Sequence, residues 1–359
     1  YFHDIETSGI HIEKYILSDV FGNDFQNVFS SMTLYNCPRM NINIHNNHFK
    51  NYNGGIELIS MSNSIIHVDN NDFNMEVSSL DTALSLPLTY PINHYGLFGI
   101  TMQNSLKAKV EFHCNNNWIS NTKYAMHIRN VTNVNTLKLH FSDNQIFFSK
   151  PVKDISGFEK GLWIENADYL GVYRNVFKYS EETPSTLSDA QQIIGIEFAY
   201  MQFGLIQQNK IINFGFGMHA KGDCSDTKLQ CNNFFSYQTG LRCNNTDQPK
   251  LPTQGVNLVS WNNIWNPLSP NIFDNNFKIG GKPLFQIEWF YISGDQKFSP
   301  IPYEYNILPD DNPITSICTS PDFTPEDERS YKYSANLNST LYSSDPDSLY
   351  HEYLGSEYF

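Results

Sequence analysis

The sequence has little charge for its length and no long apolar run. Charged residues make up 17% of the 359 positions, and 37 acidic side chains outnumber 23 basic ones. Long helices draw on Ala, Glu, Lys and Leu, so this mixture favours strands and turns. The net charge of -14 argues against a nucleic-acid partner, because binding to a phosphate backbone needs a basic surface. No run of about 18 apolar residues is present, which predicts no direct membrane span.

Familiar catalytic and metal-binding signatures are also missing. The chain contains no Gly-rich phosphate loop, no His-Glu-x-x-His helix and no Gly-x-Ser-x-Gly elbow. We therefore expect no cofactor and no metal. The six cysteines are too scattered for a zinc ribbon. Cys224, Cys231 and Cys243 could include a disulfide in an oxidising compartment, or they could be small buried residues.

The two ends of the chain carry no recognisable targeting segment. The sequence opens Tyr1-Phe2 and closes Tyr358-Phe359, without a signal peptide or terminal anchor. We interpret it as part of a longer polypeptide. Matches to the N-glycosylation pattern at Asn130, Asn244 and Asn338 carry little weight, because such matches arise by chance in an Asn-rich chain.

An internal repeat is the strongest feature that is present. Its core is Asn, any residue, then a large apolar residue. The copies are Asn47-His48-Phe49, Asn71-Asp72-Phe73, Asn116-Asn117-Trp118, Asn144-Gln145-Ile146, Asn175-Val176-Phe177, Asn209-Lys210-Ile211, Asn232-Asn233-Phe234 and a further candidate, Asn275-Asn276-Phe277. Through Asn232 the intervals run from 23 to 34 residues, except for 45 between Asn71 and Asn116. Such intervals are typical of one supersecondary unit with insertions in its loops.

A second element precedes each Asn copy. It reads small, apolar, variable, apolar, as in Gly55-Ile56-Glu57-Leu58 and Gly195-Ile196-Glu197-Phe198. This period of two indicates a short strand with one buried face. A further apolar strand, such as Ser64 to Val68, separates the two elements. Two or three strands per repeat, joined by Asn and Gly turns, predict the coil of a β-solenoid.

The repeated Asn has a physical role in such a stack. Strands of neighbouring coils lie about 4.8 Å apart, so Asn side chains at the same turn can hydrogen-bond as a ladder. Asn also tolerates the left-handed backbone of a sharp turn. We assign these residues a structural role and expect the Phe, Trp or Ile that follows to stack inside the coil. His113 with Cys114, and His45 with His48, are interpreted as single-coil coincidences rather than metal ligands.

With these repeats, residues 30 to 280 resemble the right-handed parallel β-helix, or pectate-lyase-like, superfamily. The resemblance implies an all-β, right-handed parallel β-helix with Asn-rich turns. The superfamily includes polysaccharide lyases, glycoside hydrolases, epimerases, phage tailspikes and adhesins, so the fold alone selects no function. The paired-Asp and Gly-His-Gly signatures of β-helix polygalacturonases are absent. Asp223 and Asp226 are the nearest approach to a pectate-lyase calcium site, and a loop turn explains them better.

The repeat also divides the chain. We predict an N-terminal cap or incomplete coil at 1–30, the β-helix at 31–280, and a Pro-, Asp- and Ser-rich extension or linker at 281–359. Residues 78–93 form a predicted loop extruded from one coil. The extension could cap the last coil or lead to another domain. Within it, the spacing of apolar residues in 345–359 indicates a terminal helix.

Aligning the coils on their Gly elements brings two rows of outward-facing residues together. One row reads Glu57, Thr101, His127, Trp163, Glu197, His219 and Arg242; the other reads Ile59, Gln103, Arg129, Glu165, Ala199, Lys221 and Asn244. Glu197 and His219 are candidate catalytic residues, since a carboxylate and an imidazole can share acid–base work. The candidate substrate-binding residues are His127, Arg129, Trp163, Glu165, Lys221 and Arg242. The alternative is a solvated strand face on which opposite charges pair across strands.

Two classes of function remain open at this stage. The first is a non-enzymatic extracellular or cell-surface protein, an adhesin, scaffold or carbohydrate-binding surface. The composition of the chain is similar in style to that of surface proteins of the Bacteroidota. The partners of such a protein would be polysaccharides or cell-surface and secretion-system proteins. The second is a polysaccharide lyase or glycoside hydrolase that uses the two rows. A cleft with Glu197 and His219 within hydrogen-bond reach would favour the enzyme.

Overall fold

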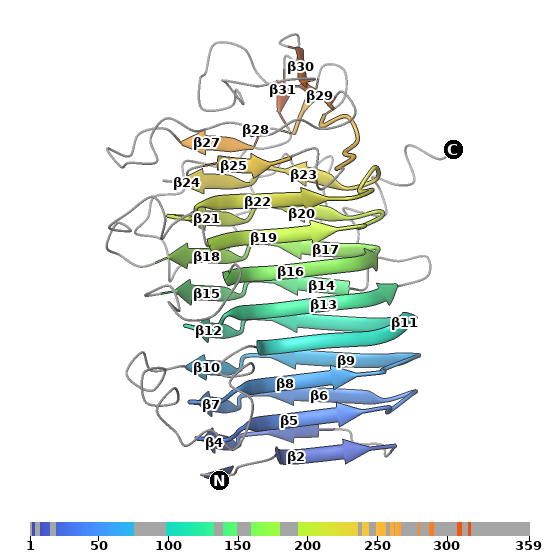
Figure 1. Ribbon diagram of the computed structural model, residues 1–359, viewed down its shortest axis with the longest axis vertical. Coiled ribbons are helices and arrows are strands. Elements are labelled where there is room, and N and C mark those ends of the chain that lie inside the picture. The colour runs from blue at the N-terminus through green and yellow to red at the C-terminus, as the bar shows by residue number, and fades with distance from the viewer. Residues whose placement is uncertain are drawn as a thin grey trace.

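The fold is an all-β solenoid in which parallel strands stack from one end of the molecule to the other (Figure 1). The computed structural model describes residues 2–3, 8–14, 19–74, 98–132, 139–148, 159–179, 193–235, 239–243, 249–255, 259–261, 263–266, 279–280, 287–290, 307–310 and 315–316. Within these ranges no helix occurs. Each coil adds one strand to each of three sheets, which we call A, B and C.

Sheet A contains the short strands that follow the repeated Asn residues. It consists of β1 (Phe2–His3), β4 (Asp24–Gln26), β7 (His48–Lys50), β10 (Asp72–Asn74), β12 (Trp118–Ser120), β15 (Gln145–Phe148), β18 (Val176–Tyr179), β21 (Lys210–Ile212), β24 (Asn233–Phe235) and β27 (Ile264–Asn266). Neighbouring strands pair in parallel and in register, as Phe49 with Phe73.

Sheet B contains the longer strands of the Gly elements. It consists of β2 (Ser8–Glu13), β5 (Ser30–Tyr35), β8 (Gly54–Ile59), the first part of β11 (Phe98–Asn115), β13 (Tyr124–Thr132), β16 (Glu159–Asp168), β19 (Ile193–Ala199), β22 (Phe216–Lys221), β25 (Thr239–Arg242) and β28 (Ile279–Gly280). β11 is long because it continues from sheet B into sheet C without a break.

Sheet C completes each coil. It consists of β3 (Asp19–Phe21), β6 (Asn41–His45), β9 (Ser64–Asp69), the second part of β11, β14 (Leu139–Ser142), β17 (Leu170–Tyr173), β20 (Leu205–Gln207) and β23 (Lys228–Gln230). Two further parallel pairs involve the C-terminal part of the chain. They are β26 (Val259–Ser260) with β31 (Thr315–Ser316), and β29 (Ile287–Phe290) with β30 (Ile307–Asp310).

A ladder of nine asparagines runs through the corner between sheets C and A. Its members are Asn23, Asn47, Asn71, Asn117, Asn144, Asn175, Asn209, Asn232 and Asn263. At every step the side-chain amide and the backbone N–H both donate to the Oδ1 of the next Asn, as from Asn144 to Asn175 at 2.9 and 3.0 Å. The predicted ladder is therefore confirmed, and it is longer than the repeat pattern indicated.

The two roles expected of Asn are divided between adjacent positions. From Asn23 to Asn232, the residue before each rung has a positive φ, near 55° at Asn70 and Asn116, whereas the rung residues do not. Gly, Asn, Asp, Arg, Gln and Cys all occupy this preceding position, at Gly22, Asn46, Asn70, Asn116, Asp143, Arg174, Gln208 and Cys231. The ladder thus selects Asn for its amide, and the turn requires only one left-handed residue beside it.

The repeat assignment was wrong by one residue in one coil. Asn117, not Asn116, forms the rung, so Ile119 takes the core position and Trp118 points outward with 43% of its surface exposed. Two copies of the tripeptide were also missed, at Asn23-Asp24-Phe25 and Asn263-Ile264-Trp265. The candidate copy at 275–277 lies outside the described residues.

The core is a column of apolar side chains enclosed by the three sheets. Phe25, Phe49 and Phe73 stack along sheet A with ring centroids 4.9 and 4.4 Å apart. A small residue faces this column at the start of each sheet B strand. At Gly161 a Cβ would lie 2.4 Å from the Phe177 ring and 2.6 Å from the Gly195 carbonyl oxygen, so close packing of coils excludes a side chain there.

The cysteines do not pair within the predicted group. Cys37, Cys114, Cys224 and Cys243 are buried free thiols, whereas Cys231 is disulfide-bonded. Burial raises the pKa of Cys224 to about 12, which makes this thiol unreactive.

Cysteine alkylation of the unfolded chain without reductant tests this assignment. We expect peptide mass spectrometry to find the four free thiols alkylated and Cys231 unmodified until reductant is added. Alkylation of Cys231 without reductant would contradict the assignment, and Cys37 serves as the internal control for complete unfolding.

The remaining sequence predictions concern chain organisation. Strands β2, β3 and β4 pair with β5, β6 and β7, so these three strands within the predicted N-terminal segment belong to the stack. Residues 78–93, and the helix predicted for 345–359, lie outside the described residues, as does most of 281–359.

Candidate functional site

The outer face of sheet B carries the two predicted rows in the predicted register. Successive strands pair Glu57 with Thr101, Thr101 with His127, and so on through Trp163, Glu197, His219 and Arg242. The second row pairs Ile59, Gln103, Arg129, Glu165, Ala199 and Lys221. Asn244 lies outside the described residues. The eight candidate site residues therefore share one face of one sheet.

Glu197 is the centre of a cluster of cations. Its Oε1 accepts a hydrogen bond from Lys160 Nζ at 2.7 Å, and its Oε2 lies 3.1 Å from His219 Nδ1 and 3.2 Å from Lys221 Nζ. The core-facing neighbours Ile196 and Phe198 show that Glu197 points away from the core. Even so, Glu197 is only 2% exposed. An outward carboxylate is thus almost fully enclosed and paired on both oxygens.

The surroundings hold Glu197 as an anion. Burial alone would raise the pKa of this carboxyl. The hydrogen bond with His219 and the charges of Lys160 and Lys221 outweigh burial and lower its pKa to about 2. Burial lowers the pKa of Lys160, and Glu197 opposes that effect. A carboxyl with so low a pKa is unprotonated at neutral pH and is a weak base.

Lys160 was not among the predicted site residues. It precedes Gly161 and reaches Glu197 on the outer face, although period-two alternation back from Trp163 would turn it toward the core. The strand pairing runs from Tyr124–Lys160 directly to Met126–Leu162, so the alternation is interrupted at the small residue. Lys160 Nζ also lies 3.6 Å from the Trp163 ring centroid, in a cation–π contact. The sequence contained enough information to identify Lys160, because the residue before each Gly element occupies the equivalent position in every coil.

Two side chains lie against the Trp163 indole. The His127 ring stacks on it at a centroid distance of 4.1 Å, and Lys160 Nζ lies 3.6 Å from its centroid while hydrogen-bonded to Glu197. A sugar ring that stacks on Trp163 has to compete with these contacts. Trp163 therefore connects coils in this structure and is not an open platform.

A second, smaller charge cluster lies beside the first. His127 Nε2 is 3.1 Å from Glu165 Oε2, and Arg129 Nε is 3.8 Å from the same oxygen. Burial lowers the pKa of His127, with Glu165 opposing. Burial would raise the pKa of Glu165, but His127 and Arg129 lower it overall. The Arg129 side chain is 54% exposed, so its guanidinium is the most accessible cation of the face.

Arg242 ends the row by covering an aromatic ring. Its guanidinium carbon lies 4.6 Å from the Phe216 centroid. Together the rows hold cations at Arg129, Lys221 and Arg242 and anions at Glu57, Glu165 and Glu197, and Lys160 adds a further cation beside them. The charges of this face are therefore nearly balanced, in a chain whose net charge is -14.

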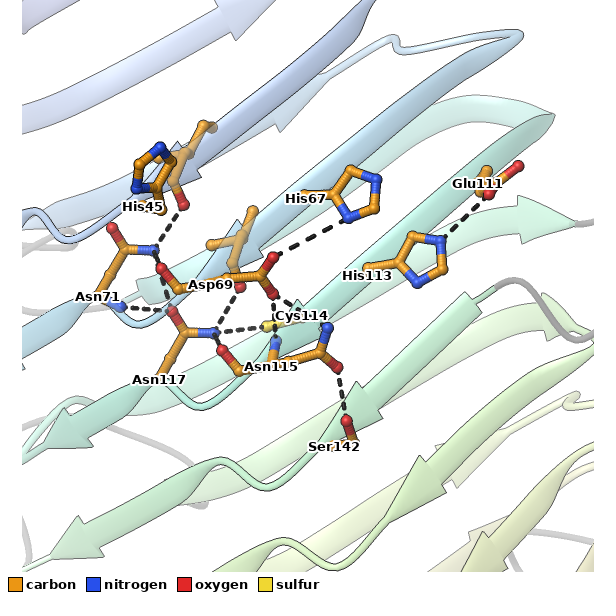
Figure 2. Close-up of polar contacts among 12 residues, drawn as sticks. His45, His67, Asp69, Asn71, Glu111, His113, Cys114, Asn115, Asn117 and Ser142 are labelled. Carbon is orange, nitrogen blue, oxygen red and sulfur yellow. Dashed lines mark hydrogen bonds and ion pairs between the residues drawn. The ribbon is translucent and has the colours of Figure 1, made fainter. Parts of the chain in front are cut away.

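His113 with Cys114, and His45 with His48, were interpreted as single-coil coincidences rather than metal ligands, but the His113 ring also has imidazole neighbours on the adjacent coils. His113 pairs with His67 on β9 and with His140 on β14, so three imidazoles form a column. Figure 2 shows the first two of them, His67 and His113. Cys114 points into the core, and His45 and His48 lie on different sheets. Among the described residues no group of three His, Cys, Asp or Glu side chains is placed to hold a metal ion.

The Asn130 sequon is used structurally. The Asn130 amide donates to the Asn104 carbonyl oxygen at 2.6 Å, and its Oδ1 accepts from Asn166 at 2.7 Å. An amide committed to neighbouring coils is a poor glycan acceptor.

Comparison of the chain with protein-family models, curated proteins and solved structures finds no match. Over the part of the chain that the structure describes, no helix is long and apolar enough to cross a membrane. The functional argument therefore depends on the geometry of the site.

Proposed function

We propose that this protein is a non-enzymatic extracellular or cell-surface protein, an adhesin or scaffold whose sheet B face binds carbohydrate. In this proposal the solenoid is a right-handed β-helix of the pectate-lyase-like type, similar in style to surface proteins of the Bacteroidota. The stack supplies a long rigid surface, and its partners are polysaccharides or cell-surface and secretion-system proteins.

The state of Glu197 is the observation that carries the non-enzymatic part. A glycosidase needs a carboxylic acid that is protonated near neutral pH, and a lyase needs a base with matched pKa. Glu197 is an enclosed anion with a pKa of about 2, paired with Lys160 and Lys221 and in contact with His219. Such a group fixes its neighbours in place and is poorly suited to exchange protons with a substrate.

The accessible cations support the binding part. Arg129 is 54% exposed at its side chain and Lys221 is 33% exposed, each held at one side by a carboxylate. A guanidinium can pair with a carboxylate or sulfate on a glycan chain through two hydrogen bonds. The row lies along the stack, so an extended acidic polymer can contact successive coils.

The disulfide at Cys231 supports the proposed location. Structural disulfides persist in oxidising compartments outside the cytosol and are rare within it. A secreted or surface-exposed protein fits this chemistry.

The alternative is a polysaccharide lyase or hydrolase, which one contact favours. His219 Nδ1 lies 3.1 Å from Glu197 Oε2, within reach for proton transfer. The same contact is part of the ion cluster around Glu197, so it fits both the binding protein and the enzyme.

A polysaccharide panel tests the proposal and its alternative together. Purified protein is incubated with neutral and acidic polysaccharides, with assays for new reducing ends, for unsaturated uronates and for binding by biolayer interferometry. We expect no cleavage, and salt-sensitive binding of an acidic polymer that Arg129→Gln weakens about tenfold, the value of one charge-assisted hydrogen bond. Arg39→Gln, at an exposed turn residue outside sheet B, is the matched control.

Two outcomes would contradict the proposal. Cleavage that disappears in a Glu197→Gln/His219→Ala double variant would establish the enzyme. Failure of every folded sample to bind any polysaccharide would remove the carbohydrate partner.

A further inference from the structure

The histidine column on sheet C has no part in the proposed function. The His67 and His113 rings stack with centroids 4.5 Å apart and an interplanar angle of 5°. His140 meets His113 edge-on at 5.1 Å. Figure 2 shows the first two rings side by side on neighbouring strands, close to the Asn71–Asn117 rung of the ladder. Three titratable rings thus bridge β9, β11 and β14 where these coils are joined.

Two carboxylates accompany the column. Glu111 Oε1 lies 3.2 Å from His113 Nε2, and Asp69 Oδ2 lies 3.9 Å from His67 Nδ1. Asp69 also accepts hydrogen bonds from Asn115, and burial raises its pKa. The other titratable or charged groups on the described strands and turns packed around the column are Asp19, His45, Lys109, Asp143, Tyr173 and Arg174.

These partners leave the middle ring poorly placed to carry a charge. Burial lowers the pKa of His113, and the charges of His140 and His67 lower it further, against the opposing effect of Glu111. Two imidazolium ions stacked at 4.5 Å repel each other at a distance where screening by salt is weak. The column can accept a first proton beside a carboxylate, but a second proton places like charges face to face.

We propose that the His67–His113–His140 column is an acid-sensitive joint between three coils of the solenoid. When the rings are neutral, they pack and add to the contact of β9, β11 and β14. When acid charges more than one of them, repulsion separates the rings and loosens these strands. Strands β17, β20 and β23 of sheet C have Gly171, Leu205 and Lys228 in the same row and lack this response.

The direction of the pH effect follows from proton binding. The folded pKa of His113 lies below its ordinary value of 6.5, so the unfolded chain binds the proton more readily. The stabilisation is therefore complete above pH 6.5 and is lost as the pH falls through the folded pKa.

NMR titration of the whole chain with isotope-labelled histidine tests the coupling. We expect His113 to titrate below its ordinary pKa of 6.5. The variants His67→Gln and His67→Phe both remove the neighbouring charge, and Phe keeps a flat ring. Each should raise the His113 midpoint by roughly half a pH unit. His11→Gln, which removes an exposed histidine on β2, should leave it unchanged. Identical His113 midpoints in all four proteins would overturn the coupling.

Hydrogen exchange tests the loosening. After correction for intrinsic rates, acidification from pH 7.5 to 5 should lower protection of β9, β14 and the second part of β11 about tenfold more than that of β20 and β23. The His67→Phe variant should reduce this difference. Equal changes in all five segments, or a wild-type difference that His67→Phe leaves intact, would overturn the acid-sensitive joint.

Discussion

Replacing Asn175 with Ala is expected to lower the free energy of unfolding by about 4 kcal/mol. The Asn175 side chain donates to the Phe141 carbonyl oxygen and to Asn209, and it accepts from the backbone and side-chain N–H groups of Asn144. All these groups are buried, and each one left without a partner costs about 1–3 kcal/mol. Urea denaturation followed by circular dichroism measures the change.

The control for Asn175 is an asparagine outside the ladder. Asn41 is exposed on the outer face of β6, so Asn41→Ala should change the unfolding free energy by less than about 0.5 kcal/mol. Equal effects of the two variants would show that the ladder adds no more than an ordinary surface residue. A small effect of Asn175→Ala alone would mean that water replaces the lost partner.

Replacing Glu197 with Gln is expected to cost about 3–5 kcal/mol, because it leaves the buried Lys160 ammonium without its anion. Lys160, His219 and Lys221 all lie within 3.2 Å of this carboxylate. Thermal unfolding of the two proteins at pH 7 measures the loss. Glu57→Gln changes the same row in a less buried coil position and should cost far less.

The same carboxylate predicts how stability depends on pH. Its folded pKa of about 2 lies below the ordinary 4.5, so its contribution is present above 4.5 and is lost as the pH falls from 4.5 towards 2. A shift of this size corresponds to about 3 kcal/mol. The wild type should therefore lose more stability than Glu197→Gln between pH 5 and 3. Parallel acid profiles of the two proteins would contradict the anionic cluster.

Much of the fold was predictable because the Asn repeat has a single structural use. The one-residue error in the repeat assignment has a physical cause. Both Asn116 and Asn117 satisfy the tripeptide, and only the backbone conformation decides which one forms the rung. The Gly elements predicted the sheet B register because close packing of coils tolerates only small residues there. Asn23 and Asn263 fit the same tripeptide and needed only a wider search.

The sequence predicted which site residues lie on neighbouring strands, but it did not predict which of their side chains are in contact. Period-two alternation located Glu197 and His219, but it failed at Lys160 because the alternation is interrupted at Gly161. The contacts of Trp163 with His127 and Lys160 depend on side-chain conformations that no sequence pattern encodes. The histidine column needed the register of sheet C, whose strands lack a glycine marker and follow loops of unequal length.

In the asparagine ladder, the distance between neighbouring coils does not depend on the number of residues between rungs. Successive rungs are 23 to 46 residues apart in sequence, yet their side-chain hydrogen bonds stay between 2.9 and 3.1 Å. Segments that leave the stack between rungs can therefore lengthen or shorten without changing the distance between coils. Evolution, or an engineer grafting a foreign peptide, can vary such segments while the scaffold beneath them keeps its geometry.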